Sequence, residues 1–171
     1  EALIELGAPV AALFTHRDAP DEEIWWRSCA NLARANSIPV YLHEKIAAEE
    51  IAQVAALRPA VIYSFYYRNL LPADLLALAP LGAYNMHGSL LPKYRGRVPV
   101  NWAVINGEAE TGATLHYMTA KPDAGDIVAQ QAVPILPDDP AAHVFGKVTA
   151  APAQVLHNCL AVLGVSAPRK M

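Results

Sequence analysis

Asn85 and His87 stand two residues apart at the end of an apolar run that is typical of a buried strand. Because alternate residues of a strand point to the same face of a sheet, the two side chains can aim at one point. An amide and an imidazole placed together can hydrogen-bond an oxyanion, and an imidazole also transfers protons near neutral pH. The alternative interpretation is that the pair only terminates the strand.

Asp123 is a third candidate, in the stretch Lys121-Pro122-Asp123-Ala124-Gly125-Asp126 between two predicted strands. A carboxylate in such a stretch usually caps a turn. If this loop folds back over the end of the sheet beside His87, the carboxylate would instead orient the imidazole or favour its charged form. The local sequence favours the turn, so both interpretations stay open at this point.

Two further segments contain groups that bind ligands. The loop after His87 carries the cations Lys93, Arg95 and Arg97, which either bind phosphate or carboxylate groups of a substrate or form a solvated face. The cluster 66–68, Tyr-Tyr-Arg, follows another strand end. It is either an aromatic lip over the core or the wall of a pocket for a flat ring system.

The remaining histidines and the cysteines give weaker signals. His116 alternates inside a predicted strand, and we expect it to be packed or on the surface. Three other histidines share no ligand spacing, so a zinc site is not expected; they are His43, His143 and His157. Cys29 and Cys159 lie in separate predicted helices, and we expect both to be buried free thiols in a reducing compartment.

The composition limits the class of protein. The 171 residues suffice for one domain with a sizeable core, and 54% of them are apolar. The net charge of -3 argues against a surface for nucleic acid, and every long apolar stretch is of strand length or interrupted by charge. The chain opens without the basic segment of a signal peptide, so we expect a cytoplasmic protein without a membrane partner.

Strands and helices alternate along the chain, which predicts an α/β fold with a mostly parallel sheet and helices on both faces. Asp21 is predicted to cap the second helix, and the last two strands should be antiparallel because a short loop joins them. The predicted strands span 9–14, 38–42, 60–66, 82–86, 111–118 and 127–135. The predicted helices span 1–6, 22–36, 45–57, 69–79, 99–107 and 140–163, and 167–171 form a tail.

Taken together, these residues resemble the formyltransferase family that uses 10-formyltetrahydrofolate, which implies a Rossmann-like three-layer fold. The family pattern is Asn-x-His before a Ser-Leu-Leu-Pro-x-x-Arg-Gly loop, followed by an Asp in an Asp-x-Gly-Asp-like turn. Here the pattern is carried by Asn85, His87, the segments 89–92 and 95–96, and Asp123, with 36 residues from His87 to Asp123. The similarity runs from about Pro9 to Leu160.

Within the family, the chain looks most like the domain that formylates UDP-4-amino-4-deoxy-L-arabinose for lipid A modification in polymyxin resistance. The segments that carry this resemblance are 64–68, 87–96, 101–102, 106–108 and 110–112. A second interpretation is a methionyl-tRNA formyltransferase, although the basic C-terminal domain usual in those enzymes is not found here. A third is an inactive fragment, or a module that only binds folate or a sugar nucleotide.

The resemblance implies a role for each candidate residue. Asn85 and His87 would stabilise the oxyanion of a tetrahedral intermediate, and Asp123 would hold His87 in its useful charge state and help to move the amine proton. The folate pocket would be lined by Tyr66, Tyr67, Ala120, Lys121, Pro122, Ala124 and Gly125. The nucleotide sugar would meet Ser89, Lys93, Tyr94, Arg95 and Arg97, and no metal would be required.

The chain departs from the family pattern at its beginning. Family members start with a strand and a Gly-containing turn, whereas this chain starts inside the helix that follows them. The first strand of a doubly wound sheet is central, so we expect the strands that flank it to be left unpaired. We therefore interpret residues 1–171 as a catalytic domain truncated at both ends, with any homo-oligomer formed through a second domain that is missing.

Overall fold

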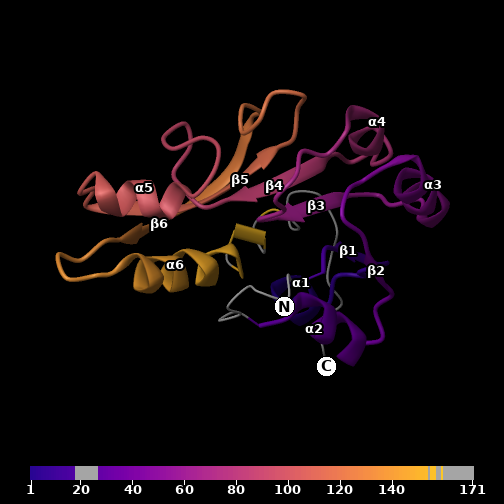
Figure 1. Ribbon diagram of the computed structural model, residues 1–171, viewed down its shortest axis with the longest axis horizontal. Coiled ribbons are helices and arrows are strands. Elements are labelled where there is room, and N and C mark those ends of the chain that lie inside the picture. The colour runs from indigo at the N-terminus through magenta and orange to yellow at the C-terminus, as the bar shows by residue number, and fades with distance from the viewer. Residues whose placement is uncertain (18–26, 154, 157–158, 160–171) are drawn as a thin grey trace.

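The computed structural model describes residues 1–17, 27–153, 155–156 and 159. Helices and strands alternate along these residues, and Figure 1 shows their arrangement. The helices are α1 (Ala2–Glu5), α2 (Cys29–Ala35), α3 (Ala48–Leu57), α4 (Ala73–Leu76), α5 (Pro99–Ile105) and α6 (Ala141–Ala150). The strands are β1 (Leu13–Thr15), β2 (Val40–Leu42), β3 (Ile62–Phe65), β4 (Ala83–His87), β5 (Glu110–Tyr117) and β6 (Ile127–Pro134).

The described strands form two sheets. β1 and β2 pair in parallel, with Leu13 opposite Val40, and the larger sheet has the order β3-β4-β5-β6. β3 and β4 are parallel, whereas β5 runs antiparallel to both of its neighbours, so the prediction for the last two strands is confirmed. No pairing joins β1 or β2 to the larger sheet within the described ranges.

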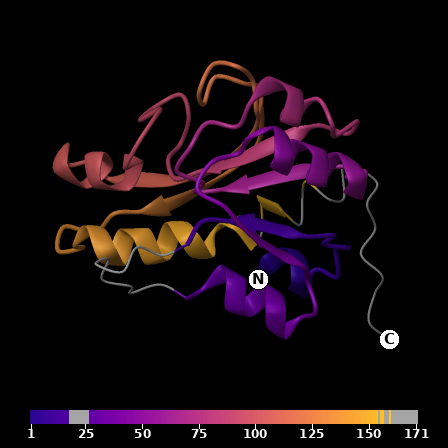
Figure 2. The same cartoon turned by 45° about the vertical axis from the view of Figure 1, so that its right-hand side comes forward.

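One apolar core holds the larger sheet against the helices around it. Tyr84 and Met86 of β4 and Leu115 of β5 are at most 1% exposed, and they pack with Val144 and Val148 of α6. Figures 1 and 2 both show α6 and the β1–β2 sheet on the same, lower side of the four-stranded sheet. Burial of these side chains holds β4, the strand of the candidate site, in the middle of the core.

Two helix starts follow from local chemistry. α5 begins with Pro99, whose missing N–H and fixed φ suit the first helical position. α2 begins at Cys29, because the Ser28 hydroxyl accepts the Asn31 N–H at 3.2 Å and so caps the helix. The prediction of a helix from residue 22 is therefore wrong at Arg27 and Ser28, and the predicted Asp21 cap lies outside the described residues.

Other expectations change in detail. Cys29 is exposed, because it stands in the first turn of α2, whereas Cys159 is buried as expected. α4 covers only four residues and begins after Pro72, which stands just before its first residue. α6 ends at Ala150, and the predicted helical residues 160–163 and the tail 167–171 lie outside the described part of the chain. No helix within the described part is long and apolar enough to cross a membrane.

Candidate active site

β4 and β5 bring three polar side chains to one place. Asn85 and His87 lie two residues apart within β4, and His116 of β5 stands directly opposite Asn85 in the antiparallel register. The Asn85 Nδ2 atom lies 3.4 Å from Nε2 of His116. Both histidines are buried, with 6% of His87 and 2% of His116 exposed. Asn85 and His87, the last residue of β4, therefore form part of a polar cluster over β4 and β5 and do more than end the strand.

The loop between β5 and β6 turns back over this cluster and adds Asp123. Its Oδ1 atom lies 3.4 Å from both Asn85 Nδ2 and His116 Nε2, and its Oδ2 atom lies 3.6 Å from His87 Nδ1. The Gly96 N–H donates to Oδ2 at 2.8 Å. The carboxylate thus meets groups from β4, β5 and the loop after β4, so its contacts go beyond those of a turn cap.

The environment of Asp123 favours its ionised form. Burial raises the pKa of the carboxyl, but the hydrogen bonds from His116 and the Gly96 N–H, together with the charges of His87 and His116, act in the other direction. The net result is a pKa lowered to about 2. Asp123 is therefore a carboxylate at neutral pH, placed between two imidazoles.

Each imidazole has one ring nitrogen that donates to a backbone carbonyl, and its second ring nitrogen lies toward the Asp123 carboxylate. His87 Nε2 donates to the Tyr94 carbonyl at 2.8 Å, which leaves Nδ1 toward Asp123. His116 Nδ1 donates to the Tyr117 carbonyl at 2.8 Å, which leaves Nε2 toward Asp123. A neutral ring of either kind has no hydrogen left for the carboxylate.

Hydrogen bonds with Thr114 of β5 hold the loop 88–97 in place. Ser89 is fully buried, and its hydroxyl donates to the Lys93 carbonyl at 2.6 Å. The Thr114 hydroxyl donates to the Ser89 carbonyl at 2.6 Å and accepts the Leu91 N–H at 3.1 Å. Ser89 was predicted to contact the acceptor, and this burial argues for a role in shaping the loop instead.

The loop cations differ in their engagement. The Lys93 ammonium lies 3.0 Å from the Glu108 carboxylate, which neutralises it locally. Arg95 and Arg97 are exposed, and neither forms a hydrogen bond or ion pair with another residue of the described ranges. Of the three predicted phosphate ligands, the two arginines are therefore the ones whose side chains form no ion pair with the described residues.

A cavity of about 240 Å³ lies on the far side of the loop 88–97. None of the residues Asn85, His87 and Asp123 reaches it. Its lining consists of Leu90, Leu91, Pro92, Lys93, Tyr94, Glu110 and Thr111. Tyr94 thus contacts both this cavity and the polar cluster, because its carbonyl accepts from His87.

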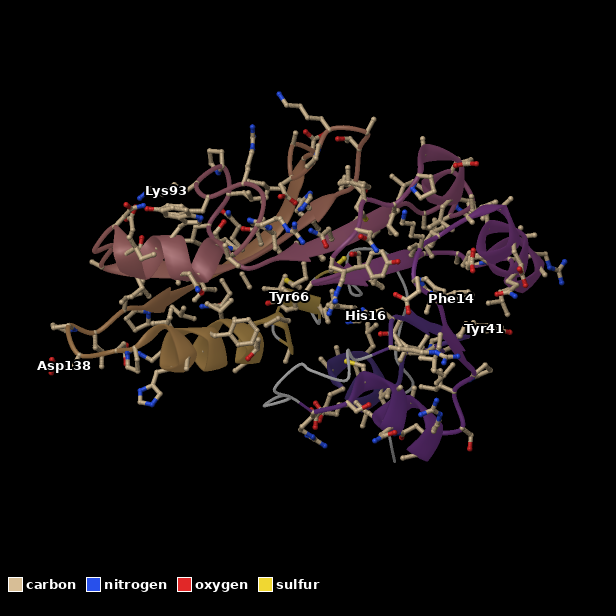
Figure 3. All side chains as sticks on the ribbon, viewed as in Figure 1. Phe14, His16, Tyr41, Tyr66, Lys93 and Asp138 are labelled. Carbon is tan, nitrogen blue, oxygen red and sulfur yellow. The ribbon has the colours of Figure 1, made fainter. Side chains whose placement is uncertain are left out.

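The residues predicted to bind folate lie at two places. Tyr66 follows β3 and has a left-handed φ of 53°. The centroid of its ring lies 6.1 Å from that of Phe145. Figure 3 shows Tyr66 between the larger sheet and the β1–β2 sheet. Tyr67 is turned toward β2, where its hydroxyl lies 3.0 Å from His43 Nε2. Ala120, Lys121 and Pro122 are exposed, whereas Ala124 and Gly125 are partly buried beside Asp123.

His116 is the residue of the cluster whose importance the sequence did not indicate. A signal existed in the alternation of β5, which puts His116 on the same face as Thr114, but the register that brings it opposite Asn85 had to come from the structure. Although two histidines and an aspartate meet here, no group of three or more His, Cys, Asp or Glu side chains among the described residues is placed so that it could hold a metal ion.

Comparison with known proteins places this site in context. A protein-family model described as formyl transferase matches residues 9–160. The chain is similar to the crystal structure of phosphoribosylglycinamide formyltransferase from Anaplasma phagocytophilum, with 27% identity and a TM-score of 0.67. The match covers 73% of this chain and 62% of that one, so this chain spans less than two thirds of that relative.

Two other solved structures share the fold. Phosphoribosylglycinamide formyltransferase from Streptococcus pneumoniae TIGR4 matches with 19% identity and a TM-score of 0.80, over 95% of this chain and 90% of that one. The sugar 3N-formyl transferase WlaRD, crystallised in the presence of dTDP and 5-N-formyl-THF, matches with 21% identity and a TM-score of 0.70. That match covers 91% of this chain and 53% of that one. With the family model spanning nearly all of the α/β domain and the polar cluster at its centre, the chain belongs to the formyl transferase family.

Proposed function

We propose that this chain transfers a formyl group from 10-formyltetrahydrofolate to the amine of UDP-4-amino-4-deoxy-L-arabinose. The observation that carries the proposal is the convergence of Asn85 and His87 on the Asp123 carboxylate, at 3.4 and 3.6 Å. Membership of the formyl transferase family supports the reaction type. The acceptor rests on the resemblance of the loop 87–96 and its neighbours to the aminosugar enzymes.

The mechanism uses the cluster to stabilise charge. Attack of the acceptor amine on the formyl carbon produces a tetrahedral centre with a developing oxyanion. Asn85 Nδ2 and a protonated His87 Nδ1 are the side-chain donors on this face, and one well-placed donor contributes about 3–4 kcal/mol to transition-state stabilisation. Because Nε2 of His87 is bonded to the Tyr94 carbonyl, Nδ1 is the nitrogen that faces the reaction.

Asp123 and His116 complete the transfer of protons. The attacking amine must lose a proton as the carbon–nitrogen bond forms, and the tetrahydrofolate nitrogen must gain one as it leaves. Asp123, a carboxylate with a pKa of about 2, holds the positive charge of His87, takes the proton that the attacking amine loses, directly or through a water, and returns it to the leaving tetrahydrofolate nitrogen. His116, held against the same carboxylate, keeps it oriented.

A nucleotide sugar suits the charges beside the cluster. Arg95 and Arg97 are free to meet phosphate oxygens, for which a guanidinium is well shaped. A related sugar formyltransferase was crystallised with a nucleotide, dTDP, and with 5-N-formyl-THF. The folate ring would lie near Tyr66 and the loop 120–125, where backbone groups can recognise its edge.

A direct comparison of acceptors tests the proposal. Formyl transfer from 10-formyltetrahydrofolate is measured with UDP-4-amino-4-deoxy-L-arabinose, phosphoribosylglycinamide and methionyl-tRNA, and we expect product with the aminosugar. Arg95→Ala and Arg97→Ala should raise the KM for that acceptor, whereas Arg34→Ala, an exposed change on α2, should leave it unaltered. Preferred use of either other acceptor would overturn the choice of sugar. If no acceptor is used and a folate analogue does not bind, the chain is an inactive fragment.

A further inference from the structure

The backbone carbonyl of Tyr94 hydrogen-bonds one nitrogen of His87 and so leaves the other nitrogen toward Asp123. This carbonyl accepts from His87 Nε2 at 2.8 Å, and Tyr94 adopts a left-handed φ of 55°. A tyrosine in this conformation needs support from its surroundings, because side chains other than glycine's are crowded there. The groups that hold Tyr94 therefore also hold the imidazole.

The support comes from Glu108. Its Oε1 atom accepts the Tyr94 hydroxyl at 2.8 Å, and its two oxygens accept the Lys93 ammonium at 3.2 and 3.0 Å. Hydrogen bonds from Lys93 and then from Tyr94 lower the pKa of Glu108, so it is a carboxylate at neutral pH. Asn106 donates to the same tyrosine oxygen at 3.1 Å.

Glu108 stands on a rigid base. Its N–H donates to the Ala103 carbonyl at 3.0 Å, just beyond the end of α5, and Gly107 makes the preceding turn with a φ of 66°. Only 23% of its side chain is exposed. The carboxylate is thus fixed by the helix end and can hold the loop 88–97 at two successive side chains.

We propose that Glu108 is a positioning residue for His87. Resting on the formyl transfer proposed above, the inference is that the chain of contacts Glu108–Tyr94–His87 holds the imidazole with its Nε2–H on the Tyr94 carbonyl, so that Nδ1 stays directed at Asp123. Glu108 itself does not touch a reacting atom. A misplacement of such a group by about 1 Å can cost on the order of a hundredfold in rate.

The test combines NMR with kinetics. Glu108→Ala removes the anchor, Tyr94→Phe removes one hydroxyl while it keeps the ring, and Glu110→Ala is the matched control, an exposed carboxylate that forms no hydrogen bond with the loop. The ¹⁵N shifts of the His87 ring report the hydrogen bonding of each ring nitrogen without any need for turnover. We expect the Nε2 shift of an N–H that is hydrogen-bonded to the Tyr94 carbonyl in the unmodified protein and in Glu110→Ala, and a changed Nε2 shift in the other two variants.

For formyl transfer, we expect kcat to fall by about tenfold or more in Glu108→Ala and Tyr94→Phe, with the KM for folate unchanged. The double variant should lose no more than the worse single one, because both changes break one chain of contacts. Unaltered His87 ¹⁵N shifts in Tyr94→Phe would overturn the inference even if Glu108→Ala fails to fold. A protein that transfers no formyl group but shows the expected shifts would overturn the proposed function alone.

Discussion

The Nε2 atom of His116 lies 3.4 Å from Oδ1 of Asp123, and the histidine is only 2% exposed. A buried imidazole and a buried carboxylate at this distance are each stabilised by the other, because neither has water to replace its partner. The contact ties the loop that carries Asp123 to β5. The site consequently contains a fourth polar side chain beside Asn85, His87 and Asp123.

His116→Gln should reduce formyl transfer, because the amide keeps a polar group near Asp123 but cannot become positively charged. We expect a loss in kcat of about tenfold or more, since the orientation of the carboxylate is disturbed. The matched control is His143→Gln, which changes an exposed histidine on α6. Equal turnover in both variants would show that His116 only fills space.

His87→Ala should lower kcat by at least about two orders of magnitude, because it removes a donor to the developing oxyanion. Asn85→Ala removes the other donor and should have an effect of similar size. Steady-state rates with saturating folate and acceptor measure both losses, and circular dichroism checks that the fold is retained. Unchanged turnover in His87→Ala would remove this residue from the mechanism.

Asp123→Asn should abolish most formyl transfer while the fold persists. The carboxylate that holds the imidazolium is lost, and an amide cannot accept the proton of the amine. The comparison variant is Asp126→Asn, an exposed change at the end of the same loop. If Asp123→Asn turns over like Asp126→Asn, Asp123 belongs to the turn and not to the reaction.

The same residue predicts a dependence of stability on pH. The folded pKa of Asp123 is lowered from 3.8 to about 2, so its stabilising effect is present above pH 4 and is lost as the pH falls toward 2. The shift corresponds to roughly 2 kcal/mol in the free energy of unfolding. Urea unfolding should give a higher free energy of unfolding for the unmodified protein than for Asp123→Asn at pH 6, and this difference should narrow below pH 4. A gap independent of pH would contradict the lowered pKa.

Gly125→Ala should disturb the site through the backbone. A Cβ atom at this position would lie 1.9 Å from the Tyr117 carbonyl oxygen, so the loop would have to move away from β5 and take Asp123 with it. We expect losses in both activity and stability. Gly146→Ala is the control, because a Cβ in α6 meets nothing within 4 Å and alanine should stabilise the helix by about 0.5–1 kcal/mol. The melting temperature should therefore fall in Gly125→Ala and rise in Gly146→Ala.

The sequence predicted the parts of the site that depend on local pattern. Asn85 and His87 share a face because a strand alternates, and β4 could be recognised from its apolar residues. His116 was missed because its place opposite Asn85 depends on the register of two strands, which side-chain alternation does not determine. Likewise, the pairing of Lys93 with Glu108 joins residues 15 positions apart across a loop and a helix, which no local pattern reveals.

The helix boundaries show the same limit. Asp21 and Ser28 both precede a run that suits a helix, and both residue types cap helices well. Only the observed bond from Asn31 N–H to the Ser28 hydroxyl identifies the start of α2. Tyr67 was expected to face a ligand together with Tyr66, but its bond with His43 turns it toward the smaller sheet. The Tyr67 contact is distant in sequence, whereas the Ser28 cap is local and only one of two similar candidates that the sequence offers.

The division of the described strands into two sheets has a consequence for amide hydrogen exchange. Asn85, His87 and His116 belong to the sheet β3–β6, and no strand pairing connects this sheet to β1 and β2 within the described residues. Segments without shared ladders can open separately, each with its own free energy. The amides of β1 and β2 should therefore exchange with solvent in events that leave the protection of β4 and β5 intact.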